Sequence, residues 1–259
     1  MARHRLIACE VFHREFCAAI ARTPNTVDVT FVPQGLHDKR AASMAESLQK
    51  HIDAVDESGY DALLLGYGLC NNGIVGLRTG RTPLIVPRAH DCITMFLGSK
   101  ERYAKIFRDN PGSYYLTSGW IERARRSIET LPTRVKGAEA SDTTYRKYVE
   151  RFGEENAQYL MEMLGHWKDK YERMVFIDLG LGDVELLRAH TRREAERRAL
   201  SFEELPGDLS LFQGLLDGPA WPKDRYLVVP PGYAIQPSYD DGVVSAERMG
   251  AALEGKRQQ

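Results

Sequence analysis

Short apolar runs that alternate with amphipathic segments constrain the fold of this chain more than any other feature. The strand-length runs in the first third of the chain are Leu6–Cys9, Val27–Val32, Asp61–Gly66 and Pro83–Val86. Between them, Val11–Ala21 and Asp38–Glu57 carry apolar residues at helical spacing. Strands that alternate with helices predict an α/β fold in which a mainly parallel, Rossmann-like sheet is flanked by helices.

The same alternation continues more loosely after residue 92. Its expected elements are a helix near Ile93–Arg108, a strand at Ser113–Thr117, a long helix over Thr144–Tyr171, a strand at Met174–Asp178, a helix over Asp183–Leu200 and a last strand at Tyr226–Val229. A polar stretch at Pro132–Asp142 has the composition of a linker. We therefore expect an N-terminal α/β half, 1–130, and a C-terminal α/β half, 131–259, packed on it, as one domain or as two lobes.

Charge and hydropathy limit the classes of partner. The 259 residues include 35 Lys and Arg against 36 Asp and Glu, which gives a formal net charge of −1. Such a chain has no global field that would concentrate nucleic acid or an anionic membrane. The apolar runs are too short to cross a bilayer, and the first residues, Met-Ala-Arg-His-Arg, lack a hydrophobic signal region. We expect a cytoplasmic protein with a small-molecule substrate.

Three of the four cysteines follow predicted strands. Cys9 ends the first run, Cys70 lies four residues beyond the third, and Cys92 follows the fourth. In an open parallel sheet the ligand site lies off the carboxyl ends of the strands. Three thiolates there predict a zinc site, or alternatively a 4Fe-4S cluster, with one open position for substrate. The competing interpretation is that these cysteines are small buried hydrophobes, as we expect for Cys17 within the first helix.

Residues beside these cysteines could transfer protons. Glu10 follows Cys9 and is either a general acid or base or a first-turn helix carboxylate. His90 is a candidate fourth ligand or proton donor. We expect Asp91 to cap a helix that begins at Cys92, which would lower the pKa of the Cys92 thiol.

Two loops have the composition of a cofactor pocket. The first, Gly66-Tyr-Gly-Leu-Cys-Asn-Asn-Gly, places Tyr67, Asn71 and Asn72 where the backbone can approach a ligand closely, although it matches neither a Walker A motif nor a dinucleotide fingerprint. The second segment, Gly112–Trp120, includes the end of the strand predicted at Ser113–Thr117. It offers Tyr115 and Trp120 as a pocket wall. The alternative for the second is an ordinary aromatic core edge.

Five short motifs carry a family resemblance. They are Ile-Ala-Cys-Glu at 7–10, Tyr-Gly-Leu-Cys-Asn-Asn-Gly at 67–73, His-Asp-Cys-Ile at 90–93, Leu-Gly-Ser-Lys-Glu-Arg-Tyr at 97–103 and Tyr-Tyr-Leu-Thr-Ser-Gly-Trp at 114–120. Over about residues 5–230 the chain resembles the domain-of-unknown-function 1638 family. The resemblance implies a setting beside corrinoid-dependent methyltransfer systems and cysteines that match Cys9, Cys70 and Cys92. The resemblance also implies that a residue matching His90 is not general in the family.

Two functions from different classes follow. The first is a cytoplasmic metal-binding protein, an enzyme of one-carbon or methyl-group metabolism such as a metal-dependent methyltransferase, because thiolate-bound zinc can activate a substrate thiol. The alternative is a non-catalytic accessory or carrier-binding protein that serves a corrinoid protein, a folate carrier or a methyltransferase. In that case the cysteines are structural.

Overall fold

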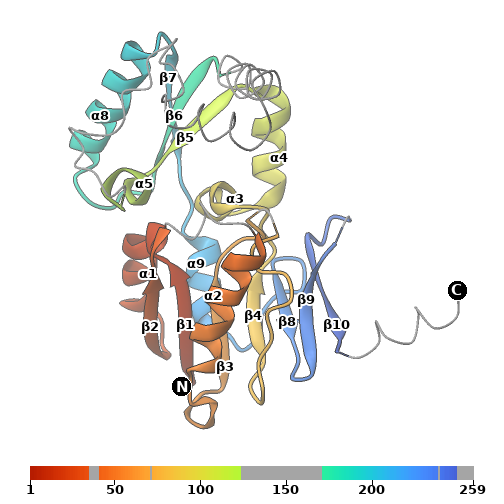
Figure 1. Cartoon of the computed structure of the whole chain (residues 1–259). Helices are drawn as coiled ribbons and strands as arrows, with labels where there is room; N and C mark the ends of the chain where they lie inside the picture. Colours follow the sequence, from red (N-terminus) through yellow and green to blue (C-terminus); the bar gives the residue numbers. More distant parts are fainter. Residues whose placement is uncertain (35–40, 71, 124–170, 239, 250–259) are drawn as a thin grey trace, which may run out of the picture. The chain divides into compact units, whose positions relative to one another are not determined.

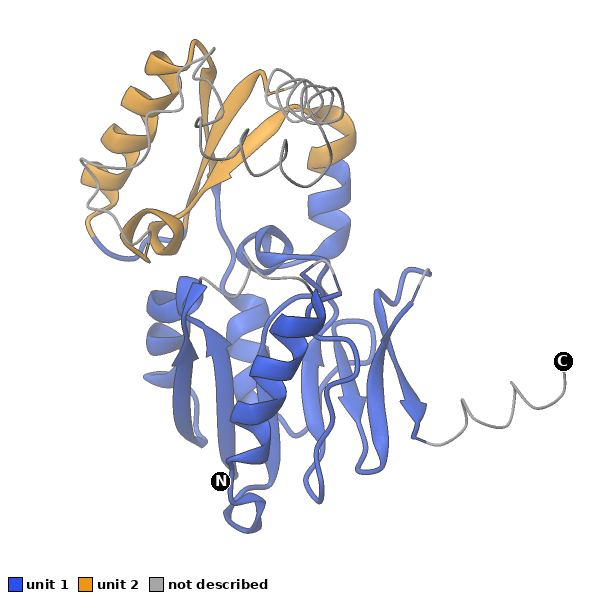
Figure 2. Cartoon of the chain, in the orientation of Figure 1, with its two compact units in different colours: residues 1–105, 179–182, 206–259 blue, residues 106–178, 183–205 orange. Residues whose placement is uncertain are grey.

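The computed structural model describes residues 1–34, 41–70, 72–123, 171–238 and 240–249. It is a mixed α/β structure whose contacts divide the chain into two compact units (Figure 2). Unit 1 comprises residues 1–105, 179–182 and 206–259, and unit 2 comprises residues 106–178 and 183–205. The predicted division near residue 130 falls in a segment outside the described residues, and the C-terminal residues 206–249 belong with the N-terminal ones in unit 1.

Unit 1 is built on sheet A, whose strand order is β2-β1-β3-β4-β8 (Figure 1). Four of these strands are parallel to one another, as the sequence predicts: β1 (Arg3–Cys9), β2 (Thr26–Val32), β3 (Ala62–Gly66) and β4 (Leu84–Pro87). β3 and β4 are buried along their whole length. Their unbroken apolar sequences reflect this position, because a central parallel strand is covered on both faces.

The chain reverses its direction of travel across sheet A between β1 and β3. After β1 it moves outward to the edge strand β2, and it then crosses back to place β3 on the other side of β1. In such a sheet the crevice between the two strands at the reversal opens at their carboxyl ends. The residues that follow β1 and β3 therefore occupy the position that ligands favour in open α/β sheets.

Helices supply the apolar surfaces that cover sheet A. A 3₁₀ turn, η1 (Glu10–Phe12), leads into α1 (His13–Ile20), which contacts α9 (Ser210–Asp217), and α9 contacts β3 and β4. α2 (Ala41–Asp53) buries Met44, Leu48 and Ile52, which recur at helical spacing, and lies in front of the sheet in Figure 1. Among the described residues, no helix is both long enough and apolar enough to span a membrane.

The C-terminal part of unit 1 departs from the parallel pattern. β8 (Tyr226–Val229) is the predicted last strand, but it pairs antiparallel with β4. The chain then forms an antiparallel hairpin of β9 (Tyr233–Pro237) and β10 (Val244–Arg248), which the sequence analysis did not predict. The Arg88 guanidinium donates hydrogen bonds to the carbonyls of Gly242 and Val244 and so ties this hairpin to the end of β4.

Unit 2 is built on sheet B, with the strand order β5-β6-β7. β5 (Ser113–Leu116) and β6 (Arg173–Asp178) are parallel, and β7 (Ser201–Pro206) lies on the other side of β6. α5 (Ser118–Arg123) and α8 (Val184–Arg197) enclose a small core of Ile121, Phe176 and Leu187. This core explains why the apolar β6 sequence was readable as a strand.

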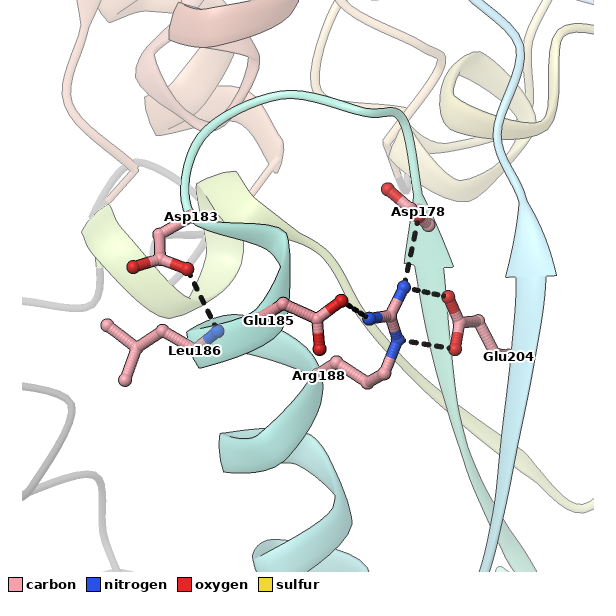
Figure 3. A network of polar contacts seen from close by, with 6 residues as sticks. All are labelled: Asp178, Asp183, Glu185, Leu186, Arg188 and Glu204. Atoms are coloured by element: carbon pink, nitrogen blue, oxygen red, sulfur yellow. Dashed lines mark hydrogen bonds and ion pairs between the residues drawn. The ribbon is translucent and has the colours of Figure 1, made fainter.

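Arg188 joins three elements of unit 2 (Figure 3). Its guanidinium donates two hydrogen bonds to Glu204 of β7, with N–O distances of 2.7 and 2.8 Å, and a further one to Glu185. Arg188 Nη2 also lies 3.5 Å from Asp178 at the end of β6. The helix predicted over Asp183–Leu200 is thus engaged by β6 and β7 at Arg188.

The predicted helix near Ile93–Arg108 is wrong as a single element. The structure has α3 (Cys92–Leu97) and α4 (Lys100–Asp109), separated at Gly98. Gly98 adopts a φ of 79°, and a Cβ there would lie 2.6 Å from Asp208. A left-handed glycine ends a helix at its C-terminus, so the break is a local consequence of this residue. The predicted linker at Pro132–Asp142 and helix at Thr144–Tyr171 lie outside the described residues.

Candidate functional site

Cys9 and Tyr67 lie side by side at the carboxyl edge of sheet A. Ala8 of β1 is in register with Gly66 of β3, so the next residue of each strand, Cys9 and Tyr67, faces the other across the reversal point. Cys9 is 2% exposed and Tyr67 is 1% exposed. The Tyr67 hydroxyl lies close enough to the Cys9 thiol for each group to affect the pKa of the other. Strand register therefore brings a thiol and a phenol together in the buried interior of the edge.

Gly66 permits this close approach. A Cβ at Gly66 would lie 2.6 Å from the Cβ of Ala8 and 2.6 Å from the ring of Phe16 on α1. Any larger residue would force β3 away from β1 and α1. The glycine at this position thus fixes the spacing of the strand ends that carry Cys9 and Tyr67.

The loop after β3 continues beside the loop after β4 and places Cys70. The amides of Leu69 and Cys70 donate hydrogen bonds to the carbonyls of Ala89 and His90, at 2.8 and 2.9 Å. A Cβ at Gly68 would lie 3.0 Å from the Ala89 carbonyl oxygen and from backbone atoms of Asp91. Backbone hydrogen bonds therefore hold Cys70 next to the segment that leads into Cys92.

Cys70 also has a strained backbone. Its φ is 47°, in the left-handed region that glycine and asparagine favour. Asn72 has a φ of 65° in the same loop. A non-glycine residue in this conformation is retained where its side chain offsets the backbone cost, and such residues concentrate at functional sites.

The two thiols influence each other electrostatically. Burial raises the pKa of Cys9 to about 11, and the backbone of Val11 and the nearby Tyr67 hydroxyl partly oppose this rise. Burial raises the pKa of Cys70 to about 12, and the nearby Cys9 and Asp91 add to the effect. Burial also raises the pKa of Tyr67, with further contributions from Cys9 and Cys70. Without a bound cation, all three groups hold their protons at neutral pH.

Asp91 caps α3, as the sequence predicts. Its carboxylate accepts hydrogen bonds from the backbone amide and the hydroxyl of Thr94, at 3.0 and 3.1 Å. α3 begins at Cys92, also as predicted, and Cys92 is partly exposed. The lowered pKa expected for the Cys92 thiol stays a prediction. His90 is exposed at the surface of the same loop.

The other predicted site residues are more scattered. Glu10 lies in η1 beside Cys9, and its carboxylate accepts a hydrogen bond of 2.7 Å from the amide of Gln34. Asn72 is exposed, and Asn71 lies outside the described residues. Tyr115 and Trp120 belong to unit 2, on β5 and α5, and the cysteines belong to unit 1. The residues that the structure brings together are Cys9, Tyr67 and Cys70, with Asp91 adjacent to Cys70.

The prediction for Cys17 is wrong. Cys17 is exposed rather than packed, with its sulfur 4.0 Å from Nε2 of His13 on the same helix. The buried positions of α1 are Glu15, Phe16 and Ala19, so Cys17 falls on the opposite side of the helix. Its exposure makes Cys17 a control cysteine outside the cluster.

Within the part of the chain that the structure describes, no three His, Cys, Asp or Glu side chains lie in an arrangement that could hold a metal ion. A site built from Cys9, Cys70 and Cys92 would therefore need a local adjustment on binding. The loop backbone already places the three cysteines near one another, and their side chains would have to rotate to bind a common metal ion.

Sequence reasoning missed the roles of Gly66 and Gly68, and it treated Tyr67 as part of a ligand-lining loop rather than as a buried partner of Cys9. The available signal was positional. Tyr67 directly follows a strand that pairs with the strand ending at Cys9, so pairing β1 with β3 would have placed the two residues together.

Comparison with known proteins identifies the family of the chain. The structure defines an α/β protein with thiols at the carboxyl edge of a mainly parallel sheet. The chain matches the family model described as "Protein of unknown function (DUF1638)" over residues 31–216, more than half of its length, and it belongs to this family. Cys70 and Cys92 lie within the matched residues, whereas Cys9 precedes them. No curated protein and no solved structure matches the chain.

Proposed function

We propose that the carboxyl edge of sheet A is a thiophilic metal site in which Cys9, Cys70 and Cys92 bind zinc, or alternatively a 4Fe-4S cluster, with one position open. The proposal is supported by one observation: Cys9 and Cys70 both lie close to Tyr67 at the carboxyl ends of β1 and β3, where sheet A reverses its strand order. We further propose that sheet A is Rossmann-like, with β2-β1-β3-β4 as its parallel part, and that the two units are two lobes.

The raised thiol pKa values are compatible with metal binding. A divalent cation stabilises thiolates far more than burial destabilises them, so binding would displace the protons of Cys9 and Cys70. Cys92 would join from the start of α3 as the third ligand. Because the protons must leave, metal affinity would rise with pH up to the raised thiol pKa values of about 11 and about 12.

The chemistry that fits such a site is methyl-group or one-carbon transfer. A substrate thiol at the open position would lose its proton to Glu10 or His90, and its thiolate would attack a methyl donor whose leaving group keeps the bonding electron pair. His90 is exposed and Glu10 lies beside Cys9, so both can exchange protons with solvent or substrate. We place this metal-dependent methyltransferase in the cytoplasm, where thiol ligands stay reduced.

The burial of the thiols favours a second candidate function. Cys9 and Cys70 carry raised pKa values, as cysteines that serve only as packing residues do. The protein would then be a non-catalytic accessory or carrier-binding protein for a corrinoid protein or a methyltransferase. Its cysteines would contribute to stability alone.

Metal content separates the two functions. The full chain and its Cys9→Ser, Cys70→Ser, Cys92→Ser and Cys17→Ser variants are purified anaerobically and analysed for zinc, iron and sulfide. We expect about one metal centre per chain in the wild type and in Cys17→Ser, and a loss of metal in the other three. Iron and sulfide with strong absorbance near about 400 nm would assign the cluster instead of zinc. Metal-free, folded wild-type protein that takes up neither metal would overturn the metal proposal.

A further inference from the structure

We propose that the β9–β10 hairpin is a strap that controls access to two loops at the carboxyl edge of sheet A, and that the Arg88 side chain is the latch that holds this strap closed. The first loop follows β3 and carries Cys70, and the second loop follows β4 and leads to Cys92. The latch acts on a strained turn at Val243, so its release favours opening. This device requires no bound metal.

Hydrogen bonds connect the strap to both loops. The amide of Gly76 donates to the carbonyl of Ile235 in β9 at 2.8 Å, and the amide of Ile235 donates to the carbonyl of Leu77 at 3.0 Å. Gly76 and Leu77 belong to the first loop, after its cysteine. Arg88 is the first residue of the second loop, directly after β4. The strap therefore contacts the end of one loop and the beginning of the other.

Arg88 binds the turn between β9 and β10 through backbone carbonyls. Its Nη1 donates hydrogen bonds to the carbonyl of Gly242, at 2.6 Å, and to that of Val244. Its Nε donates to the carbonyl of Lys223 at 2.7 Å, ahead of β8. A Cβ at Gly242 would lie 3.1 Å from Nη1 of Arg88, so the glycine permits this close approach. One guanidinium thus joins the end of β4 to the turn.

Val243 is strained between the two carbonyls that Arg88 Nη1 binds. Its φ is 65°, and the amide of Val244 donates across it to the carbonyl of Gly242 at 2.7 Å. A β-branched residue is an outlier in this left-handed region, and a three-residue turn with a positive central φ is the strained form. The Val243 side chain is fully buried. Such a conformation persists only where its surroundings hold it, as Arg88 does here.

The strain gives the strap a second, open state. When Arg88 releases the two carbonyls, the backbone at Val243 can relax, and the turn no longer holds β9 against the first loop. Local opening of this kind frees protected amides and exposes neighbouring side chains without unfolding the whole protein. The amides of Gly76 and Ile235 report on the strap, and the partly buried Cys70 reports on the first loop.

Amide hydrogen exchange of the metal-free full chain, resolved by residue with NMR, tests the latch. Arg88→Ala should speed exchange about 10–100-fold at Gly76 and Ile235, because it removes hydrogen bonds from a charged donor. The amide of Leu64, in the centre of sheet A, should keep its wild-type rate. Arg3→Ala is the matched control, since it removes two guanidinium hydrogen bonds at the amino end of β1. Unchanged exchange at Gly76 and Ile235, or equal acceleration at Leu64, would overturn the latch.

Substitutions at Val243 test the strain separately. Val243→Gly and Val243→Ala both remove the buried side chain, but only glycine adopts a positive φ without steric cost. In the Arg88→Ala chain, Val243→Gly should therefore slow exchange at Gly76 about fivefold relative to Val243→Ala. The same two changes with Arg88 intact decide the question if Arg88→Ala fails to fold. Equal rates in the glycine and alanine variants would show an unstrained turn and overturn the proposal.

Thiol labelling tests whether the first loop opens with the strap. Arg88→Ala should speed alkylation of Cys70 by iodoacetamide about tenfold, because opening exposes its sulfur, and it should leave the exposed Cys17 unchanged. Faster exchange at Ile235 with unchanged labelling of Cys70 would overturn the control of access. Both measurements use metal-free protein, so failure of the metal proposal leaves the strap intact, and failure of the strap leaves the metal proposal intact.

Discussion

Cys9 and Tyr67 are neighbours at the carboxyl ends of two hydrogen-bonded parallel strands, and the Tyr67 hydroxyl lies close to the Cys9 thiol. This contact places a thiol and a phenol at the point where sheet A reverses its strand order. Cys70 joins them from the following loop. The account of this protein depends on that arrangement of thiols.

The strained backbone of Cys70 gives a stability prediction. Cys70→Gly should leave the free energy of unfolding within about 1 kcal/mol of the wild type, because relief of the left-handed strain offsets the lost sulfur contacts. Cys9→Gly is the matched change in an extended backbone, with a φ of −63°. It should cost about 2–3 kcal/mol, because it loses a buried side chain and gains chain entropy on unfolding. Urea unfolding measures both, and equal losses would contradict the strain argument.

The buried thiols should make the metal-free protein sensitive to alkali. The folded pKa values of Cys9 and Cys70, about 11 and about 12, lie above the ordinary thiol value of 9.0, so the unfolded chain releases these protons first. Their stabilising effect is complete below about pH 9 and is lost as the pH rises toward 11. Each thiol should lower the free energy of unfolding by about 1 kcal/mol per pH unit above pH 9.

Urea unfolding of the metal-free protein between pH 8.5 and 10 measures this loss, below the ordinary pKa of tyrosine at about 10. Cys9→Ala should remove about half of it, and Cys17→Ala none. A stability that stays flat over this range in the wild type would contradict the burial of the thiols.

His4 should make the protein sensitive to acid. It is fully buried in β1 with its ring 5.8 Å from that of Trp221, and burial lowers its pKa. The unfolded chain therefore binds a proton that folded His4 resists. The stabilising effect is present above the ordinary histidine pKa of about 6.5 and is lost as the pH falls below it.

One such proton can change the free energy of unfolding by at most about 1.4 kcal/mol per pH unit. His4→Phe should reduce the acid dependence of the urea midpoint between pH 7 and 5, whereas His90→Gln at the exposed loop should not. An unchanged pH profile in His4→Phe would show that other groups control acid unfolding.

Arg188 should be essential to the local order of unit 2. Its loss leaves the carboxylates of Asp178, Glu185 and Glu204 close together without their shared cation (Figure 3). Arg188→Ala should speed amide hydrogen exchange in the first turns of α8 and in β7, and added salt should lessen the effect by screening the repulsion. Arg193→Ala, at an exposed position of the same helix, is the control. Equal exchange in both variants would show that the network does not order these elements.

The sequence predicted the elements whose patterns are local and strong. The parallel strands β1 to β4 were readable because central strands such as β3 are continuous apolar runs, and the Asp91 cap was readable from its position before α3. The break at Gly98 was a local signal that the sequence analysis missed, because a left-handed glycine ends α3 there. The antiparallel pairing of β8 was not predictable, because it depends on contacts with distant residues of β4 such as Pro87.

The candidate site was predictable only in part for a similar reason. The position of Cys9 after a strand follows from the local pattern, whereas its proximity to Tyr67 depends on which strand pairs with β1. The exposure of Cys17 depends on which face of α1 meets the sheet. Strand order and helix rotation are tertiary properties that a single sequence specifies weakly.

Zinc K-edge X-ray absorption of the zinc-loaded full chain tests the central claim most directly, because it counts the sulfur atoms bound to the metal. The account predicts a shell of sulfur neighbours at about 2.3 Å in the wild type and in Cys17→Ser, with fewer sulfurs in Cys70→Ser. A shell made only of nitrogen and oxygen neighbours at about 2.0–2.1 Å, unchanged by Cys70→Ser, would contradict it.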